Sequence, residues 1–145
     1  MLVQRVIKEE ITSFIELACK LWPHHTAEEM REDMAALLAR EDAAIFLAYD
    51  GEKAIGFAQC QLRHDYVEGT DSSPVGYLEG IYVAAEYRKQ GVARELLAAC
   101  EGWAKVRGCA EFASDCELDN VQSLQFHLNV GFHEANRIIC FTKKL

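Results

Sequence analysis

Long apolar runs are absent from this sequence of 145 residues. The longest apolar run, Ala43–Tyr49, holds seven residues, whereas a helix needs about 20 to cross a bilayer. The first five residues, Met-Leu-Val-Gln-Arg, also lack the basic-then-apolar order of a secretion signal. We therefore expect a cytoplasmic protein with no membrane span.

Positive charge is scarce as well. The sequence has 15 Lys and Arg residues against 23 Asp and Glu residues, which gives a formal net charge of -8. Because nucleic-acid binding depends on Lys and Arg neutralising phosphates, this balance disfavours a nucleic-acid partner. A cationic partner or substrate would instead be attracted.

Metal-ligand spacing is also missing. No two of the six cysteines are spaced as Cys-x-x-Cys, and His24 and His25 have no cysteine near them in sequence. We therefore predict no bound metal. In a reducing cytoplasm the thiols are expected to stay free. We assign to the core Cys60, Cys100, Cys109, Cys116 and Cys140.

What the sequence does contain is alternating strand and helix patterns. The expected strands are 2–7, 43–49, 54–62, 75–83, 110–115 and 137–142, and the expected helices are 11–22, 26–38, 91–106 and 120–130. A tight turn at Asp50-Gly51 predicts a hairpin, and period two predicts one shared strand face for Val75, Tyr77, Glu79, Ile81 and Val83. With no linker or repeat, we expect a single α/β domain over residues 1–145.

The most informative segment is Arg88-x-x-Gly91-x-Ala93, which follows a strand and opens a helix. Small residues allow close backbone approach, and the free amides of a helix N-terminus bind phosphate. The residues alone leave two readings open, a phosphate site or an ordinary helix start. The Walker and Rossmann glycine spacings are absent, which disfavours ATP and NAD.

Together with Asn120 at the start of a later helix and Gly131-Phe132 after it, this segment resembles the acetyl-CoA signature of the GCN5-related N-acetyltransferases. The resemblance implies an α/β fold with a mixed central sheet flanked by helices. It also implies acetyl-CoA as co-substrate, with its pyrophosphate on the backbone amides of residues 88–93 and Asn120 on the pantetheine arm. The residues expected to bind acetyl-CoA are Ile81, Tyr82, Val83, Arg88, Lys89, Gln90, Gly91, Val92, Ala93 and Asn120.

Other segments resemble the bacterial aminoglycoside 6'-N-acetyltransferases more narrowly. They are Leu21-Trp22-Pro23-x-His25, Arg63-His64-Asp65-Tyr66-Val67, Asp71-Ser72-Ser73-Pro74, Leu78-Glu79-Gly80-Ile81 and Ala113-Ser114-Asp115. The resemblance implies a homodimer and an aminoglycoside pocket lined by Trp22, His25, Tyr66, Glu79 and Asp115. Asn136 stands where some members have a further acidic residue.

Glu79 and His127 are the expected catalytic residues. A carboxylate in mid-strand is costly without a partner, so Glu79 is either a surface residue at a frayed strand end or functional. The resemblance favours a general base, acting directly or through a water. Asp115 is a turn aspartate on sequence alone and an ammonium partner by resemblance. His127 stands where many relatives have a tyrosine that protonates the CoA thiolate, and Tyr82 is the alternative donor.

These residues predict direct acetyl transfer from acetyl-CoA to the 6'-amine of an aminoglycoside, which would confer antibiotic resistance. Two alternatives stay open at this point. The acceptor could be another small polyamine or a protein amine, or the domain could bind acetyl-CoA without catalysis. The sequence does not rank individual antibiotics.

Overall fold

The computed structural model describes all 145 residues and is built on one five-stranded sheet. The strands are β1 (Leu2–Arg5), β2 (Ala43–Asp50), β3 (Lys53–Arg63), β4 (Val75–Val83) and β5 (Phe112–Ala113), in that spatial order. Neighbours are antiparallel from β1 to β4, and β5 is parallel to β4. The mixed sheet flanked by helices is therefore confirmed.

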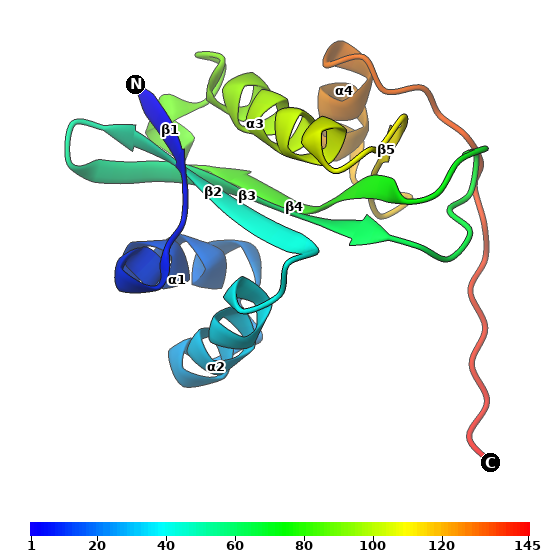
Figure 1. Ribbon diagram of the computed structural model, residues 1–145, viewed down its shortest axis with the longest axis horizontal. Coiled ribbons are helices and arrows are strands. Elements are labelled where there is room, and N and C mark those ends of the chain that lie inside the picture. The colour runs from blue at the N-terminus through cyan, green and yellow to red at the C-terminus, as the bar shows by residue number, and fades with distance from the viewer.

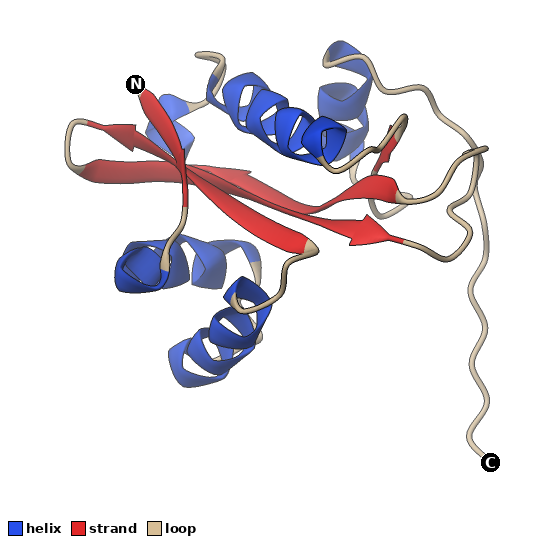
Figure 2. Cartoon of the chain, viewed as in Figure 1, coloured by secondary structure: helices blue, strands red, loops and turns tan.

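The helices lie on both faces of the sheet (Figures 1 and 2). On one face are α1 (Ile11–Leu21) and α2 (Ala27–Leu38); on the other are α3 (Val92–Val106) and α4 (Val121–Asn129). The capping box holds, because Thr26 Oγ1 accepts a hydrogen bond of 3.1 Å from the Glu29 amide. The hairpin is also confirmed, with Gly51 at φ 60° in the turn. No helix has the length and apolarity needed to cross a membrane.

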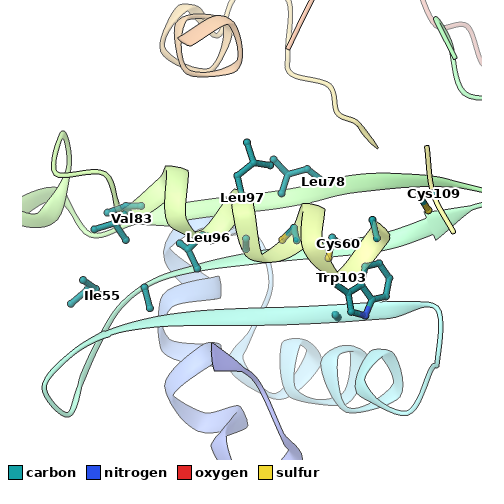
Figure 3. Packing of buried hydrophobic residues seen from close by; sticks show 14 residues of the cluster. Ile55, Cys60, Leu78, Val83, Leu96, Leu97, Trp103 and Cys109 are labelled. Atoms are coloured by element: carbon teal, nitrogen blue, oxygen red, sulfur yellow. The ribbon is translucent and has the colours of Figure 1, made fainter. Parts of the chain in front are cut away.

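Two apolar clusters fill the space between sheet and helices. Phe57 and Phe14 pack edge to face at 4.9 Å between ring centroids on the α1 side. On the α3 side, Leu96, Leu97 and Trp103 cover β3 and β4 (Figure 3). All six cysteines are free. Three of those assigned to the core are buried there, but Cys116 and Cys140 are exposed, so that part of the assignment is wrong.

A β-bulge in β4 overturns the expected strand face. Gln59 pairs with Gly80 and Cys60 pairs with Leu78, which leaves Glu79 as the extra residue. The strand therefore changes faces at Glu79. Ile81 and Val83 pack on the α3 side with Leu78, whereas Tyr82 packs on the α1 side. Period two fails here because the bulge inserts one residue that the pattern cannot detect.

Of the two strands predicted nearest the C-terminus, one is shorter than expected and the other is absent. The strand expected over 110–115 shortens to β5, with two residues paired to β4. The strand expected over 137–142 is absent, and the chain there runs away from the sheet with exposed side chains (Figure 1). Without a neighbouring strand, an apolar alternating segment has no backbone partners to form a ladder with.

Candidate active site

A fork between β4 and β5 is the first component of the site. Their pairing stops after Gly76 with Phe112 and Tyr77 with Ala113. Beyond Tyr77, β4 continues to Val83 with no strand on that side. Its outer backbone groups are therefore free to bind an extended ligand as a further strand would be bound. The edge residues expected to contact pantetheine, Ile81, Tyr82 and Val83, lie on this stretch.

The turn after β4 leads into the N-terminus of α3. Lys89 has φ 61° and Gly91, the N-cap, has φ 85°, both in the left-handed region. Such a turn directs successive amides toward one point, where an anion is favoured by the helix dipole as well. Arg88 Nε donates to the Val83 carbonyl at 2.8 Å and so fixes the turn to the end of β4. The arrangement fits a pyrophosphate held by backbone amides.

The side chains of this turn differ in exposure. Lys89, Gln90 and Gly91 are exposed, whereas Val92 is 4 % exposed and packs in the α3 cluster. Gln90 Nε2 donates to the Glu86 carbonyl at 3.0 Å. Val92 can therefore serve a ligand through its amide alone.

A small cleft of about 230 Å³ opens between β4 and the α1–α2 pair. It is lined by Trp22, His25, Met30, Asp33, Met34, Gln59 and Glu79. Three residues expected at the acceptor pocket, Trp22, His25 and Glu79, are thus brought together. Trp22 packs closely on the sheet because Gly80 has no side chain: a Cβ there would lie 2.6 Å from Trp22 Cζ2.

Glu79 has the partner that a mid-strand carboxylate requires. Arg63 Nη2 donates to both of its oxygens, at 2.9 and 3.1 Å, and Arg63 Nε donates at 3.2 Å. The guanidinium carbon of Arg63 lies 3.4 Å from the centre of the Tyr77 ring, and the Tyr77 hydroxyl donates to Asp115. The two carboxylates expected to bind the substrate are therefore joined by one network that runs from β3 through β4 to the chain just after β5.

Burial, followed by the bond to Asp115, raises the pKa of Tyr77 well above its usual range. The phenol therefore stays a neutral donor to Asp115. Since a donated hydrogen bond fixes the carboxylate, Asp115 is held near the fork while its other lone pairs stay available to a cation.

Comparison with known proteins shows the family of this chain. The Acetyltransferase (GNAT) family matches residues 8–132. The chain belongs to the GNAT acetyltransferase family. It is 44% identical over 135 residues to the aminoglycoside N(6')-acetyltransferase type 1 of Acinetobacter haemolyticus, covering 93% of this chain and 92% of that protein.

Two solved structures resemble this GNAT protein over nearly its whole length. The apo crystal structure of aminoglycoside 6'-N-acetyltransferase AAC(6')-IG from Acinetobacter haemolyticus has a TM-score of 0.95 and 40% identity, covering 100% of this chain and 99% of that one. AAC(6')-Iy in complex with the bisubstrate analogue CoA-S-monomethyl-acetylneamine also has a TM-score of 0.95, at 38% identity, covering 99% and 97%.

In this acetyltransferase, Asn120 is the N-cap of α4, and His127 on α4 contacts the chain just after β5. Asn120 Oδ1 accepts from the Ser123 amide at 3.1 Å, which caps the helix and leaves the Nδ2 donors free. His127 Nε2 lies 2.8 Å from Ser114 Oγ on the chain just after β5. Tyr82, the other proton-donor candidate, packs on the opposite face of the sheet.

Three predicted acceptor residues do not line the cleft of this GNAT protein: Asp115, which bonds to Tyr77, and also Tyr66 and Asn136. Tyr66 is 75% exposed in the 64–74 loop, and its hydroxyl accepts from the Gly69 amide at 3.4 Å. Asn136 Nδ2 donates to Glu68 Oε1 at 3.0 Å on the same loop. The structure therefore gathers Tyr66 and Asn136 beside the loop, not beside Glu79.

Four residues of the acetyltransferase site were not assigned roles from sequence: Gln59, Arg63, Tyr77 and Ser114. Arg63 and Ser114 lie inside segments that carry the family resemblance, and this position could have identified them as candidate site residues. Tyr77 was noted in the sequence only as one position of an alternating strand pattern. Gln59 is 8% exposed, and its Oε1 has no hydrogen-bond partner although it lines the cleft.

Proposed function

We propose that this protein transfers the acetyl group of acetyl-CoA to the 6'-amine of an aminoglycoside by direct attack in a ternary complex, conferring resistance. It is an aminoglycoside 6'-N-acetyltransferase, since relatives with that activity match it at 38 to 44% identity over nearly the full chain. The observation that carries the mechanism is Glu79, which lines the cleft on the α1–α2 side of β4 and pairs with Arg63 at 2.9 Å.

Acetyl-CoA supplies the activated acetyl group. The amides of residues 88–93 hold its pyrophosphate. The left-handed backbone at Lys89 and Gly91 and the dipole of α3 both favour an anion there. Ile81, Tyr82 and Val83 hold the pantetheine arm along the free β4 edge, and Asn120 Nδ2 donates to it. An amide near Ile81 polarises the carbonyl oxygen as negative charge develops there.

The acceptor binds through its positive charges. Asp115 pairs with one ammonium, and Trp22 and His25 line the wall of the cleft on the other side of Glu79. Tyr66 and Asn136 contact the outer part of the antibiotic from the loop side. A polycation suits this site because Glu79 and Asp115 give two carboxylates against the single guanidinium of Arg63.

Glu79 removes the proton of the attacking amine, directly or through a water. Its side chain is 20% exposed, and Arg63 fixes its orientation. The amine nitrogen then bonds to the acetyl carbon, the carbon–sulfur bond breaks, and His127 is the source of the proton that the thiolate takes up. Without a positioned base, turnover falls by about 100-fold or more.

The test uses Glu79→Gln, which removes the base but keeps a hydrogen-bonding amide beside Arg63. CoA release would be followed with kanamycin, with an aminoglycoside lacking the 6'-amine, with spermidine and with a histone-tail peptide. Of these four compounds, we expect only kanamycin to cause CoA release. The rate of release should be about 100-fold lower in Glu79→Gln, while the CoA affinity measured by calorimetry stays unchanged. Equal turnover with spermidine or peptide would favour the broader acceptor, and tight CoA binding without product from any amine would favour a non-catalytic domain.

We also propose that residues 1–145 form one domain that works as a cytoplasmic homodimer. The six free thiols suit a reducing compartment.

The C-terminal segment supports the dimer, because Ile138, Ile139 and Phe141 are 69, 80 and 87% exposed on an extended chain. Apolar side chains in such a row are typical of an interface, and a second copy would supply the missing backbone partners. Light scattering should give twice the mass of 16.3 kDa, and Ile139→Asp with Phe141→Asp should give the monomer.

A further inference from the structure

Ser114 and His127 meet at the point where β4 and β5 separate. His127 Nε2 lies 2.8 Å from Ser114 Oγ, and Ser114 Oγ lies 3.4 Å from the Leu78 carbonyl oxygen. The last β4–β5 pair, Tyr77 with Ala113, lies one residue earlier. The hydroxyl is therefore at the apex of the fork, next to the free β4 edge.

The bonds of His127 decide where its protons lie. Nδ1 is 2.6 Å from the Ser123 carbonyl oxygen, which can only accept, so Nδ1 carries a hydrogen. In the neutral ring Nε2 then has none and accepts from the Ser114 hydroxyl. In the charged ring Nε2 donates to Ser114 Oγ. The hydroxyl hydrogen is then directed to the β4 side of the fork, where the Leu78 carbonyl oxygen at 3.4 Å accepts it.

Apart from Ser123 Oγ, which lies 3.3 Å from Nδ1, the remaining close side chains around the imidazole are apolar rings. Phe126 and Phe132 lie 5.3 and 5.1 Å from it between centroids. They fix its plane and offer no competing acceptor. The proton on Nε2 therefore has one protein partner, Ser114 Oγ.

We propose that Ser114 and His127 form a proton relay to the departing CoA thiolate, an inference that rests on the acetyl transfer proposed above. As the carbon–sulfur bond breaks, the Ser114 hydroxyl gives its proton to the sulfur. Ser114 Oγ at once takes the Nε2 proton of charged His127, and the ring is left neutral with its hydrogen on Nδ1. One proton moves from imidazolium to thiolate, while the amine proton leaves through Glu79. Ser114 is thus the group that touches the sulfur.

The expected effect is moderate, because a thiol of pKa about 8.5 is already a tolerable leaving group near neutral pH. We expect Ser114→Ala and His127→Gln each to lower kcat by about 10- to 100-fold, at the low end of general-acid effects. Since both act in one relay, the double variant should be no slower than the slower single variant. The KM for acetyl-CoA should change by less than about 2-fold because binding rests on other groups.

The experiment measures kcat and KM with single-turnover controls that place chemistry as the slow step. Ser114→Thr keeps a hydroxyl and should restore most of the rate, which a merely structural loss would not allow. The matched controls are Ser13→Ala on α1 and His133→Gln, an exposed residue after α4. Neither residue has a part in the proposed reaction, and both variants should keep wild-type kcat. If Ser114→Ala does not fold, Ser114→Gly takes its place.

Several results would overturn the relay: wild-type kcat in Ser114→Ala, equal loss in Ser114→Thr, or a double variant slowed by the product of the two single effects. Failure of the acceptor assignment looks different. If the wild type acetylates another amine but no aminoglycoside, only the acceptor is wrong, and the same variants test the relay with that amine. If no amine yields free CoA, the relay falls with the transfer reaction.

Discussion

Gly80→Ala perturbs the wall of the proposed acceptor cleft from the sheet side. The new Cβ would lie 2.6 and 2.8 Å from Trp22 Cζ2 and Cη2, and 3.4 Å from Leu21 Cδ2. Because carbon atoms normally approach to about 3.5–4.0 Å, the indole must move outward by roughly 1 Å. Phe57, 5.7 Å away between ring centroids, packs on the same indole and resists the shift.

We expect this overpacking to cost about 1–3 kcal/mol of folding free energy, or roughly 3–10 °C in Tm for a chain of this size. A 1 Å displacement of a positioning group lowers kcat/KM for kanamycin by about 10- to 100-fold. The affinity for CoA should stay unchanged, because Gly80 faces the α1 side, away from α3.

The assays are a thermal melt, steady-state kinetics with kanamycin and calorimetry with CoA. Gly102→Ala is the matched control, since its Cβ would meet nothing within 4 Å on an exposed face of α3. That control should gain about 0.5–1 kcal/mol, because alanine suits a helix better than glycine. A Gly80→Ala protein with wild-type Tm and wild-type KM for kanamycin would refute the assignment of Trp22 to the acceptor wall.

Three further substitutions test other parts of the site. Gln59→Met removes the unpaired buried Oε1, so thermal melts should show unchanged or higher stability. The KM for kanamycin should rise about 10-fold, as for a lost hydrogen bond of about 1.4 kcal/mol. Lower stability with unchanged KM would contradict a role of Gln59 in substrate binding. Burial and Asp115 raise the pKa of Tyr77. The protonated phenol therefore contributes to folding stability below the usual tyrosine pKa of about 10, and this contribution is lost at higher pH. In urea unfolding, the free energy of Tyr77→Phe should fall less than that of the wild type between about pH 9 and 12. Gly91→Ala, at φ 85° with no steric conflict, should cost about 1 kcal/mol and weaken calorimetric CoA binding; unchanged affinity would place the phosphates elsewhere.

Most helices were predictable because their signals are local. The Thr26 cap, Pro23 and the Gly91 start each act within one turn of the chain, and α1, α2, α3 and α4 begin within about two residues of the expected positions. The β5 and C-terminal strands failed for the opposite reason. A strand exists only when another strand lies beside it, and the partner of 137–142 is not in the sequence pattern.

The acceptor site was predictable only in part. Trp22, His25 and Glu79 meet in one cleft, as the family resemblance implied. Tyr66 and Asn136 instead lie on the 64–74 loop. Arg63 stayed without a role because the contact that matters joins β3 to a bulged position of β4, 16 residues away.

By itself, the sequence determined the order of elements, the glycine turn that opens α3 and the acidic character that favours a cationic acceptor. These depend on residue type and short spacing, which the chain carries locally. The tertiary structure decided which face Glu79 takes, that Arg63 bridges it to Tyr77 and Asp115, and that Ser114 meets His127. Such pairings depend on strand register and on the bulge, because a one-residue change in register exchanges the two faces of a sheet.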